Sequence, residues 1–165
     1  MSAEPLTDEQ LKDQAIKQAL AGDDAGARKT ASQILGSHNL RQVWQVMVLV
    51  AAERRNVRAV IDAIRSCPDE KLLYCHDYRE LPLRFIDAGD VDGAIEIART
   101  MSGLGWVGIL GAAFYFAKGG DLARAKDVLS YVPEELGTLV LPKLDECSSK
   151  ARAQRNRPEG ERKGT

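Results

Sequence analysis

The sequence has 165 residues, of which 44% are hydrophobic and 28% charged, and its formal net charge is -1. This length favours one globular domain, and the balanced charge argues against a nucleic-acid coat or a polybasic membrane binder. The 21 alanines and 18 leucines, with only 5% aromatic residues, favour helices over strands. We therefore predict an all-α fold.

The start of the chain is polar and lacks the basic residues and apolar run of a signal peptide. The three cysteines are odd in number and irregularly spaced, unlike those of a disulfide framework. These features predict a cytoplasmic protein with reduced thiols. Thr7, followed three residues later by Gln10, predicts a capping box that opens the first helix.

A short phrase, in which Gly-Asp is followed by Ala five residues after the Gly, occurs three times in the chain. In a degraded fourth copy, Arg55 and Asn56 replace the Gly and the Asp. Glycine suits a helix C-terminus, and Asp or Asn caps the next helix, so each copy predicts a tight turn between antiparallel helices. We call the first residue of each copy the turn anchor: Gly22, Arg55, Gly89 and Gly120. The anchors are 33, 34 and 31 residues apart, a spacing typical of a helical solenoid.

After each anchor, small and apolar residues recur at steps of four and three, which places them on one face of a helix. These four stripes are Ala27, Ala31 and Ile34; Val60, Ile64 and Cys67; Ala94, Ala98 and Met101; and Ala125, Leu129 and Val132.

Two later segments need separate treatment. Pro82 predicts a broken helix over residues 74–82, with a shorter helix starting at Leu81 or Pro82. The stretch 100–117 holds no charge, which is at the lower limit for a membrane span. Its glycines favour a buried helix instead, in which Gly105, Gly108 and Gly111 allow close packing on neighbouring helices.

The C-terminal part of the sequence predicts a capping helix over about residues 134–152, and we expect Pro142 to interrupt it. Residues 150–165 hold six basic and two acidic residues and lack apolar ones to bury. We predict that they form a disordered basic tail after a single domain over residues 1–149.

The helical units resemble the tetratricopeptide repeat, a 34-residue helix-turn-helix unit. The resemblance covers roughly residues 8–132, and its match is better in the second helix of each unit than in the first. Related helical-hairpin repeats are the alternative. The resemblance implies a right-handed α-solenoid of about four antiparallel helical hairpins with a C-terminal capping helix.

Residues that could carry chemistry are few. The histidines are His38 and His76, and the run Cys75-His76-Asp77 lacks the short-spaced ligand pair common in structural zinc sites. There is no nucleophile-elbow motif and no glycine-rich phosphate loop. We therefore predict a protein that is not an enzyme and that uses no metal or other cofactor.

In the tetratricopeptide-repeat family the first helices line a concave groove that binds extended peptides or partner helices. Counting back from the anchors, the resemblance implies a groove with an apolar floor and a polar N-terminal half. Its candidate residues are Lys12, Ile16, Gln45, Leu49, His76, Arg79, Leu83, Ile86, Leu110 and Phe114. Clamping of a peptide's terminal carboxylate is disfavoured, because only Lys12 and Arg79 could contribute to it and the Asn partners are absent.

The expected partner is an apolar or amphipathic segment of another protein, bound by an adaptor, scaffold or chaperone-like module. No nucleic acid and no membrane span are predicted. The alternatives are a self-assembling structural subunit, forming homo-oligomers, and a regulatory subunit of a larger complex. The terminal helix, with Leu136, Leu139, Val140, Leu141 and Leu144, could also fold back and fill the groove.

Overall fold

The structure is a computed structural model that describes residues 5–156. This part of the chain is all-helical, as the composition predicts, with ten α-helices, one 3-10 helix and no strand. It divides into two compact units. Unit 1 comprises the residues up to 81 together with 100–102, and unit 2 comprises 82–99 together with the residues from 103 on.

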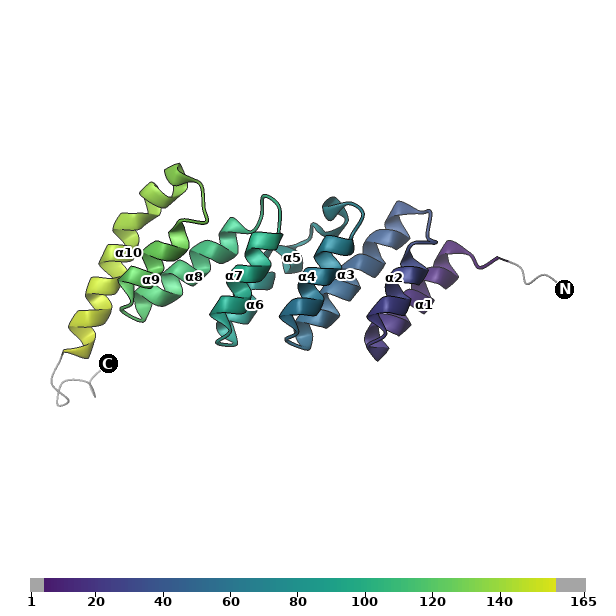
Figure 1. Cartoon of the computed structure of the whole chain (residues 1–165), viewed down its shortest axis with the longest axis horizontal. Coiled ribbons are helices and arrows are strands. Elements are labelled where there is room, and N and C mark those ends of the chain that lie inside the picture. The colour runs from purple at the N-terminus through teal and green to yellow at the C-terminus, as the bar shows by residue number, and fades with distance from the viewer. Residues whose placement is uncertain (1–4, 157–165) are drawn as a thin grey trace. The chain divides into compact units, whose positions relative to one another are not determined.

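Unit 1 is built from paired helices. α1 packs against α2 and α3, and α3 packs against α4 and the 3-10 helix η1. In Figure 1, α1 lies beside α2 and α3 lies beside α4. The elements are α1 (Asp8–Ala21), α2 (Asp24–Ala31), α3 (Ser37–Glu53), α4 (Val57–Ser66), η1 (Glu70–Leu73) and α5 (His76–Arg79).

Unit 2 begins within the first turn of α6, and its last helix is its longest. α8 packs against α9, and α10 packs against both of them. The elements are α6 (Leu81–Asp87), α7 (Val91–Thr100), α8 (Trp106–Lys118), α9 (Leu122–Leu129) and α10 (Glu134–Arg155).

The four predicted turns share one geometry. Each anchor has a positive φ, and the next residue accepts a hydrogen bond from the backbone N–H three positions further on, at 2.9–3.0 Å. The φ angles are 88° at Gly22, 54° at Arg55, 86° at Gly89 and 77° at Gly120. Arg55 is the only residue other than glycine with a positive φ in the described part of the chain. The degraded copy therefore makes the same turn without the residue best suited to it.

The predicted stripes form much of the core. All of their residues are buried except Cys67, which is half-buried. The last residue of every stripe lies beyond the end of its helix, and at Cys67 the backbone directly after α4 is extended.

The predicted helix starts are confirmed at two places. Thr7 and Gln10 form the reciprocal capping box at the start of α1. The helix before Pro82 breaks at Glu80, and α6 starts at Leu81. Pro82 therefore lies in a first helical turn, where a missing N–H leaves no hydrogen bond unmade.

Two expectations about the C-terminal helix need correction. Pro142 does not interrupt α10, which is continuous across it. The helix also continues to Arg155, so residues 150–155, assigned to the tail, are helical. Lys150 forms an ion pair with Glu146 one turn earlier, at 2.6 Å, and Arg155 donates a hydrogen bond to the Gly119 carbonyl. The remainder of the predicted tail, 157–165, lies outside the described residues.

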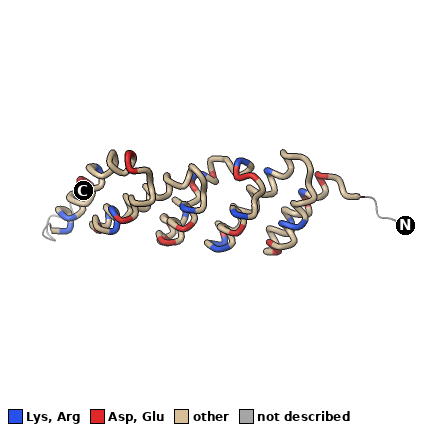
Figure 2. Tube along the Cα trace, turned by 45° about the horizontal axis from the view of Figure 1, so that its top comes forward, with Lys and Arg blue, Asp and Glu red and all other residues tan. Residues whose placement is uncertain are grey.

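α8 is the uncharged helix, and its glycines pack closely within unit 2. A Cβ at Gly108 would lie 2.4 Å from Pro82 Cβ, and one at Gly111 would lie 2.4 Å from Leu83 Cδ2. Lys118, its last residue, is the one charged residue of α8. Figure 2 shows charges of both signs in each unit. Among the described residues, no helix combines the length and apolarity needed to cross a membrane.

Candidate functional site

The groove residues predicted in unit 1 lie on α1, α3 and α5. Ile16 and Leu49 stand at the same register, six residues before their anchors, and both are half-buried. Lys12 forms ion pairs with Glu9 and, at 3.7 Å, with Asp13.

The other three polar candidates of unit 1 differ in what they contact. The Gln45 amide donates to the Leu72 carbonyl at 3.1 Å, so it ties α3 to η1. His76 and Arg79 are exposed on α5, and His76 lies 3.2 Å from the carboxylate of Glu80. Gln45 is thus hydrogen-bonded within the unit, whereas His76 and Arg79 are exposed to solvent on α5.

In unit 2 the predicted groove residues lie on α6 and α8. Leu83, Leu110 and Phe114 are half-buried. Ile86 is buried and is therefore not a groove residue in this structure. It packs beside Gly111, where its Cδ1 lies 3.2 Å from the position of an added Cβ. Ile86 stands three residues before its anchor. The residues at this position before each of the four anchors are all buried: Ala19, Ala52, Ile86 and Ala117.

The terminal helix α10 packs on α8 and α9 as α3 packs on α1 and α2. Leu144 and Ser148 are its buried residues. The other apolar residues expected to cover the groove are less buried, and Leu139 is 72% exposed. α10 therefore takes the place of a next first helix, with most of its apolar N-terminal half in contact with solvent.

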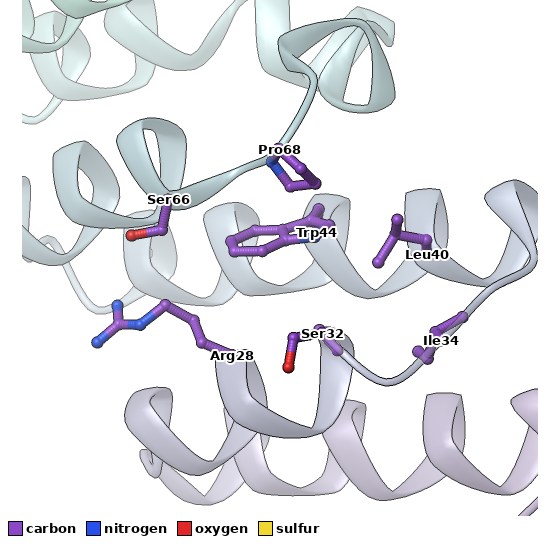
Figure 3. Close-up of a pocket in the computed structure, with 8 residues that line it drawn as sticks. Arg28, Ser32, Ile34, Leu40, Trp44, Ser66 and Pro68 are labelled. Carbon is purple, nitrogen blue, oxygen red and sulfur yellow. The ribbon is translucent and has the colours of Figure 1, made fainter.

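A pocket of about 330 Å³ lies in unit 1, between α2, α3 and the segment that follows α4. Figure 3 shows Arg28 and Ser66 at one end of it and Ile34 and Leu40 at the other, with the Trp44 indole between them. The lining residues are Arg28, Ala31, Ser32, Ile34, Leu40, Trp44, Ser66 and Pro68. The pocket thus has a polar, cationic end and an apolar end, a size and character typical of small-ligand sites.

Two polar groups of this pocket have no partner within the described residues. Arg28 makes no ion pair or side-chain hydrogen bond in residues 5–156. The Trp44 indole N–H is buried and has no acceptor in that part of the chain. A buried donor without an acceptor costs about 1–3 kcal/mol, and such groups call for an explanation.

Unit 2 contains a second recess, of about 400 Å³, at the same repeat register. Lys126 stands six residues after its anchor, as Arg28 does, and Ser130 stands ten after, as Ser32 does. In unit 2, however, the cation is neutralised, because Lys126 pairs with Asp145 of α10 at 3.2 Å. α3, which packs on α2 as α10 packs on α9, has no acidic residue before its last position, Glu53.

Sequence reasoning missed both recesses. The signal available in the sequence was a basic residue followed four positions later by a serine. It occurs in the first unit at Arg28 and Ser32 and in the fourth at Lys126 and Ser130. The two recesses lie between the second helix of a unit and the helix that follows it, α2 and α3 in one case and α9 and α10 in the other. The distance between such helices cannot be read from a sequence pattern.

Other ionisable groups are perturbed without forming a site. Burial raises the pKa of the Cys67 thiol to about 11. Burial, followed by the hydrogen bond to Glu70, raises the pKa of Tyr78. Within residues 5–156, no group of three or more His, Cys, Asp or Glu side chains could hold a metal ion.

Comparisons of the chain with protein-family models, curated proteins and solved structures found no match.

Proposed function

We propose that this protein is a non-catalytic protein-protein interaction module of the tetratricopeptide-repeat type. In this proposal its paired helices form a right-handed α-solenoid, and the first helix of each pair lines a concave groove. The groove binds an apolar or amphipathic segment of a partner protein, by extended-peptide or helix-in-groove contacts. The setting we propose is the cytoplasm.

The observation that carries the proposal is a contrast between two registers of the first helices. Three residues before each anchor the side chains are buried, whereas six residues before it they are large, apolar and only half-buried. The half-buried set is Ile16, Leu49, Leu83 and Phe114. A large apolar residue at the same half-exposed register of every first helix is what a shared binding face requires. Burying a fully exposed side chain of this size is worth about 1.5–3 kcal/mol, so covering the exposed part of three of them would contribute a fraction of that each toward the cost of association.

The test is a pull-down from native lysate with a Leu83→Glu, Phe114→Glu double variant. The control is Leu139→Glu, which places one added carboxylate on an exposed leucine of α10 outside the proposed groove. Circular dichroism checks the helical content of each protein. We expect a partner that wild type and the control capture and the double variant loses. A partner captured equally by all three would contradict a groove site.

A self-assembling subunit is the second candidate, favoured by the exposed Leu139 of α10 and the half-buried Leu136, Val140 and Leu141 near it. Light scattering at micromolar concentration separates the two. A wild-type oligomer that Leu139→Glu converts to a monomer would support self-assembly through α10 rather than a partner groove.

A further inference from the structure

We infer that the unit 1 pocket binds a small amphipathic carboxylate, with its anionic group at Arg28 and its apolar body between Trp44 and Leu40. This inference goes beyond the proposed partner groove, since it concerns a different surface and a small organic ligand.

The first argument is the polarity of the pocket. Arg28 and Ser66 lie at one end, Ser32 lies between the ends, and the side chains at the other end, Ile34 and Leu40, are aliphatic. A ligand that fills about 330 Å³ of such a space must carry its charge at one end only. The Trp44 side chain, which is 4% exposed, lines the space between the ends.

The second argument is charge complementarity, for which the chain supplies its own comparison. At the same register of unit 2, Lys126 receives a carboxylate from Asp145 on the following helix. In unit 1 the following helix, α3, has no acidic residue before its last position, Glu53, and Arg28 makes no ion pair or side-chain hydrogen bond within the described residues. The chain thus supplies a carboxylate to the cation of the unit 2 recess and none to Arg28 in the unit 1 pocket. A ligand carboxylate would supply the group that pairs with Arg28. Arginine suits this task because its planar guanidinium can donate two parallel hydrogen bonds to a carboxylate.

The third argument concerns which elements a ligand would touch. The lining residues come from α2, α3 and the segment after α4, which contributes Pro68. A bound ligand would therefore connect the two helix pairs of unit 1. Because such a ligand binds only the folded unit, binding raises the thermal stability of the protein.

The experiment uses the full chain with Trp106→Phe, which leaves Trp44 as the single tryptophan. Trp106 is 43% exposed at the start of α8 in unit 2, so its removal leaves the pocket untouched. The probe is 4-phenylbutyrate, and the neutral control is 4-phenylbutyramide, which has the same apolar body. Trp44 fluorescence and Tm are recorded over a titration that would saturate a site with a Kd of about 1 mM.

We expect a saturable change in Trp44 fluorescence and a rise in Tm with the carboxylate, and at least a tenfold weaker response with the amide. Arg28→Gln should weaken carboxylate binding at least tenfold, while its unit 2 counterpart Lys126→Gln should leave it unchanged. The Leu83→Glu, Phe114→Glu variant should bind the probe as the parent does, which separates this site from the proposed groove.

Three results would overturn the inference: no saturable response to the carboxylate, equal binding of acid and amide, or unchanged binding by folded Arg28→Gln. Circular dichroism verifies the fold of each variant, and Arg28 is not a core residue, so its replacement by Gln leaves the unit intact.

Discussion

The hydroxyl of Tyr78 donates a 2.7 Å hydrogen bond to the carboxylate of Glu70, across the break between η1 and α5. The same oxygen of Glu70 accepts the Ser102 backbone N–H at 2.8 Å. Tyr78 is 2% exposed, so Glu70 supplies the acceptor that this buried hydroxyl would otherwise lack. One carboxylate thus joins three segments of unit 1.

Replacing Glu70 tests that role. Glu70→Ala should lower the free energy of unfolding by about 1–3 kcal/mol, because a buried hydroxyl loses its acceptor. Glu70→Gln keeps an acceptor oxygen and should recover most of the loss. Urea unfolding measures both, and the double variant with Tyr78→Phe closes a mutant cycle. Equal losses for Ala and Gln would show that the hydrogen bonds are not what matters.

Arg55 offers a chance to stabilise the chain. Its φ of 54° is a left-handed conformation that costs a residue with a side chain about 1–2 kcal/mol. Glycine would avoid this cost, and its greater conformational entropy in the unfolded state would offset only part of the gain. Arg55→Gly should therefore raise Tm.

The reverse change at Gly89 is the matched control. An added Cβ there meets no atom within 4 Å, so Gly89→Ala tests backbone strain alone and should lower Tm. If both variants left Tm unchanged, the left-handed geometry would not be a cost in these turns.

The packing of α8 predicts a difference between two of its glycines. Gly108→Ala places a Cβ 2.4 Å from Pro82 Cβ and 3.1 Å from Ala98 Cβ, on side chains that cannot turn away. Overpacking of this kind costs about 1–3 kcal/mol, which exceeds the gain of about 1 kcal/mol in helix propensity.

Gly111→Ala should be far milder, since its nearest contact is the end of the flexible Leu83 side chain. Chemical denaturation of the two variants, with circular dichroism as the signal, provides the comparison. A Gly108→Ala protein as stable as wild type would contradict the close packing of α8 on α6.

The Cys67 thiol should be unreactive at neutral pH. Burial raises its pKa from the ordinary 9.0 to about 11, and the thiolate is the nucleophile in alkylation. In a Cys75→Ser, Cys147→Ser background, the iodoacetamide rate should rise with a midpoint near pH 11, and with a midpoint near 9 in urea. Peptide mass spectrometry follows the reaction, and coincident midpoints would contradict the burial effect.

The same shift has a consequence for stability. Because the folded pKa lies above the unfolded one, the neutral thiol stabilises the fold fully below about pH 9, and this contribution is lost as the pH rises through about 11. The raised pKa of Tyr78 acts in the same direction. Cys67→Ala should therefore reduce the loss of Tm between these pH values, which thermal scans at each pH would record.

Local signals in the sequence predicted the turns and the stripes because each depends on residues close together in the chain. The capping box at Thr7, the turn at Arg55 and the restart of the helix at Leu81 follow from single side chains and their backbone preferences. The predictions that failed depend on tertiary context. Ile86 is buried because α8 presents a glycine to it, and α10 passes Pro142 without a break.

The candidate pocket could not be predicted from the sequence for a related reason. Arg28 and Lys126 look equivalent in the sequence, and their difference lies in the partner that the following helix places beside them. The partner of Lys126, Asp145, is about 20 residues away and belongs to a different element, whereas α3 offers Arg28 no such carboxylate. Only the packed helices bring each cation and its neighbour together.

The guanidinium of Arg54, at the end of α3, donates to the carbonyls of Ala19 and Leu20 at 3.0 and 2.7 Å. These carbonyls belong to the last turn of α1, where the helix leaves carbonyls without intrahelical donors and where the Ala19 carbonyl also accepts the Gly22 backbone N–H. α1 packs against α3, and the buried residues of α1 are all apolar: Leu11, Ala15 and Ala19. A shift of α3 by one residue along α1 would break both bonds at once. Arg54 therefore fixes the longitudinal alignment of two helices whose apolar contact leaves it open.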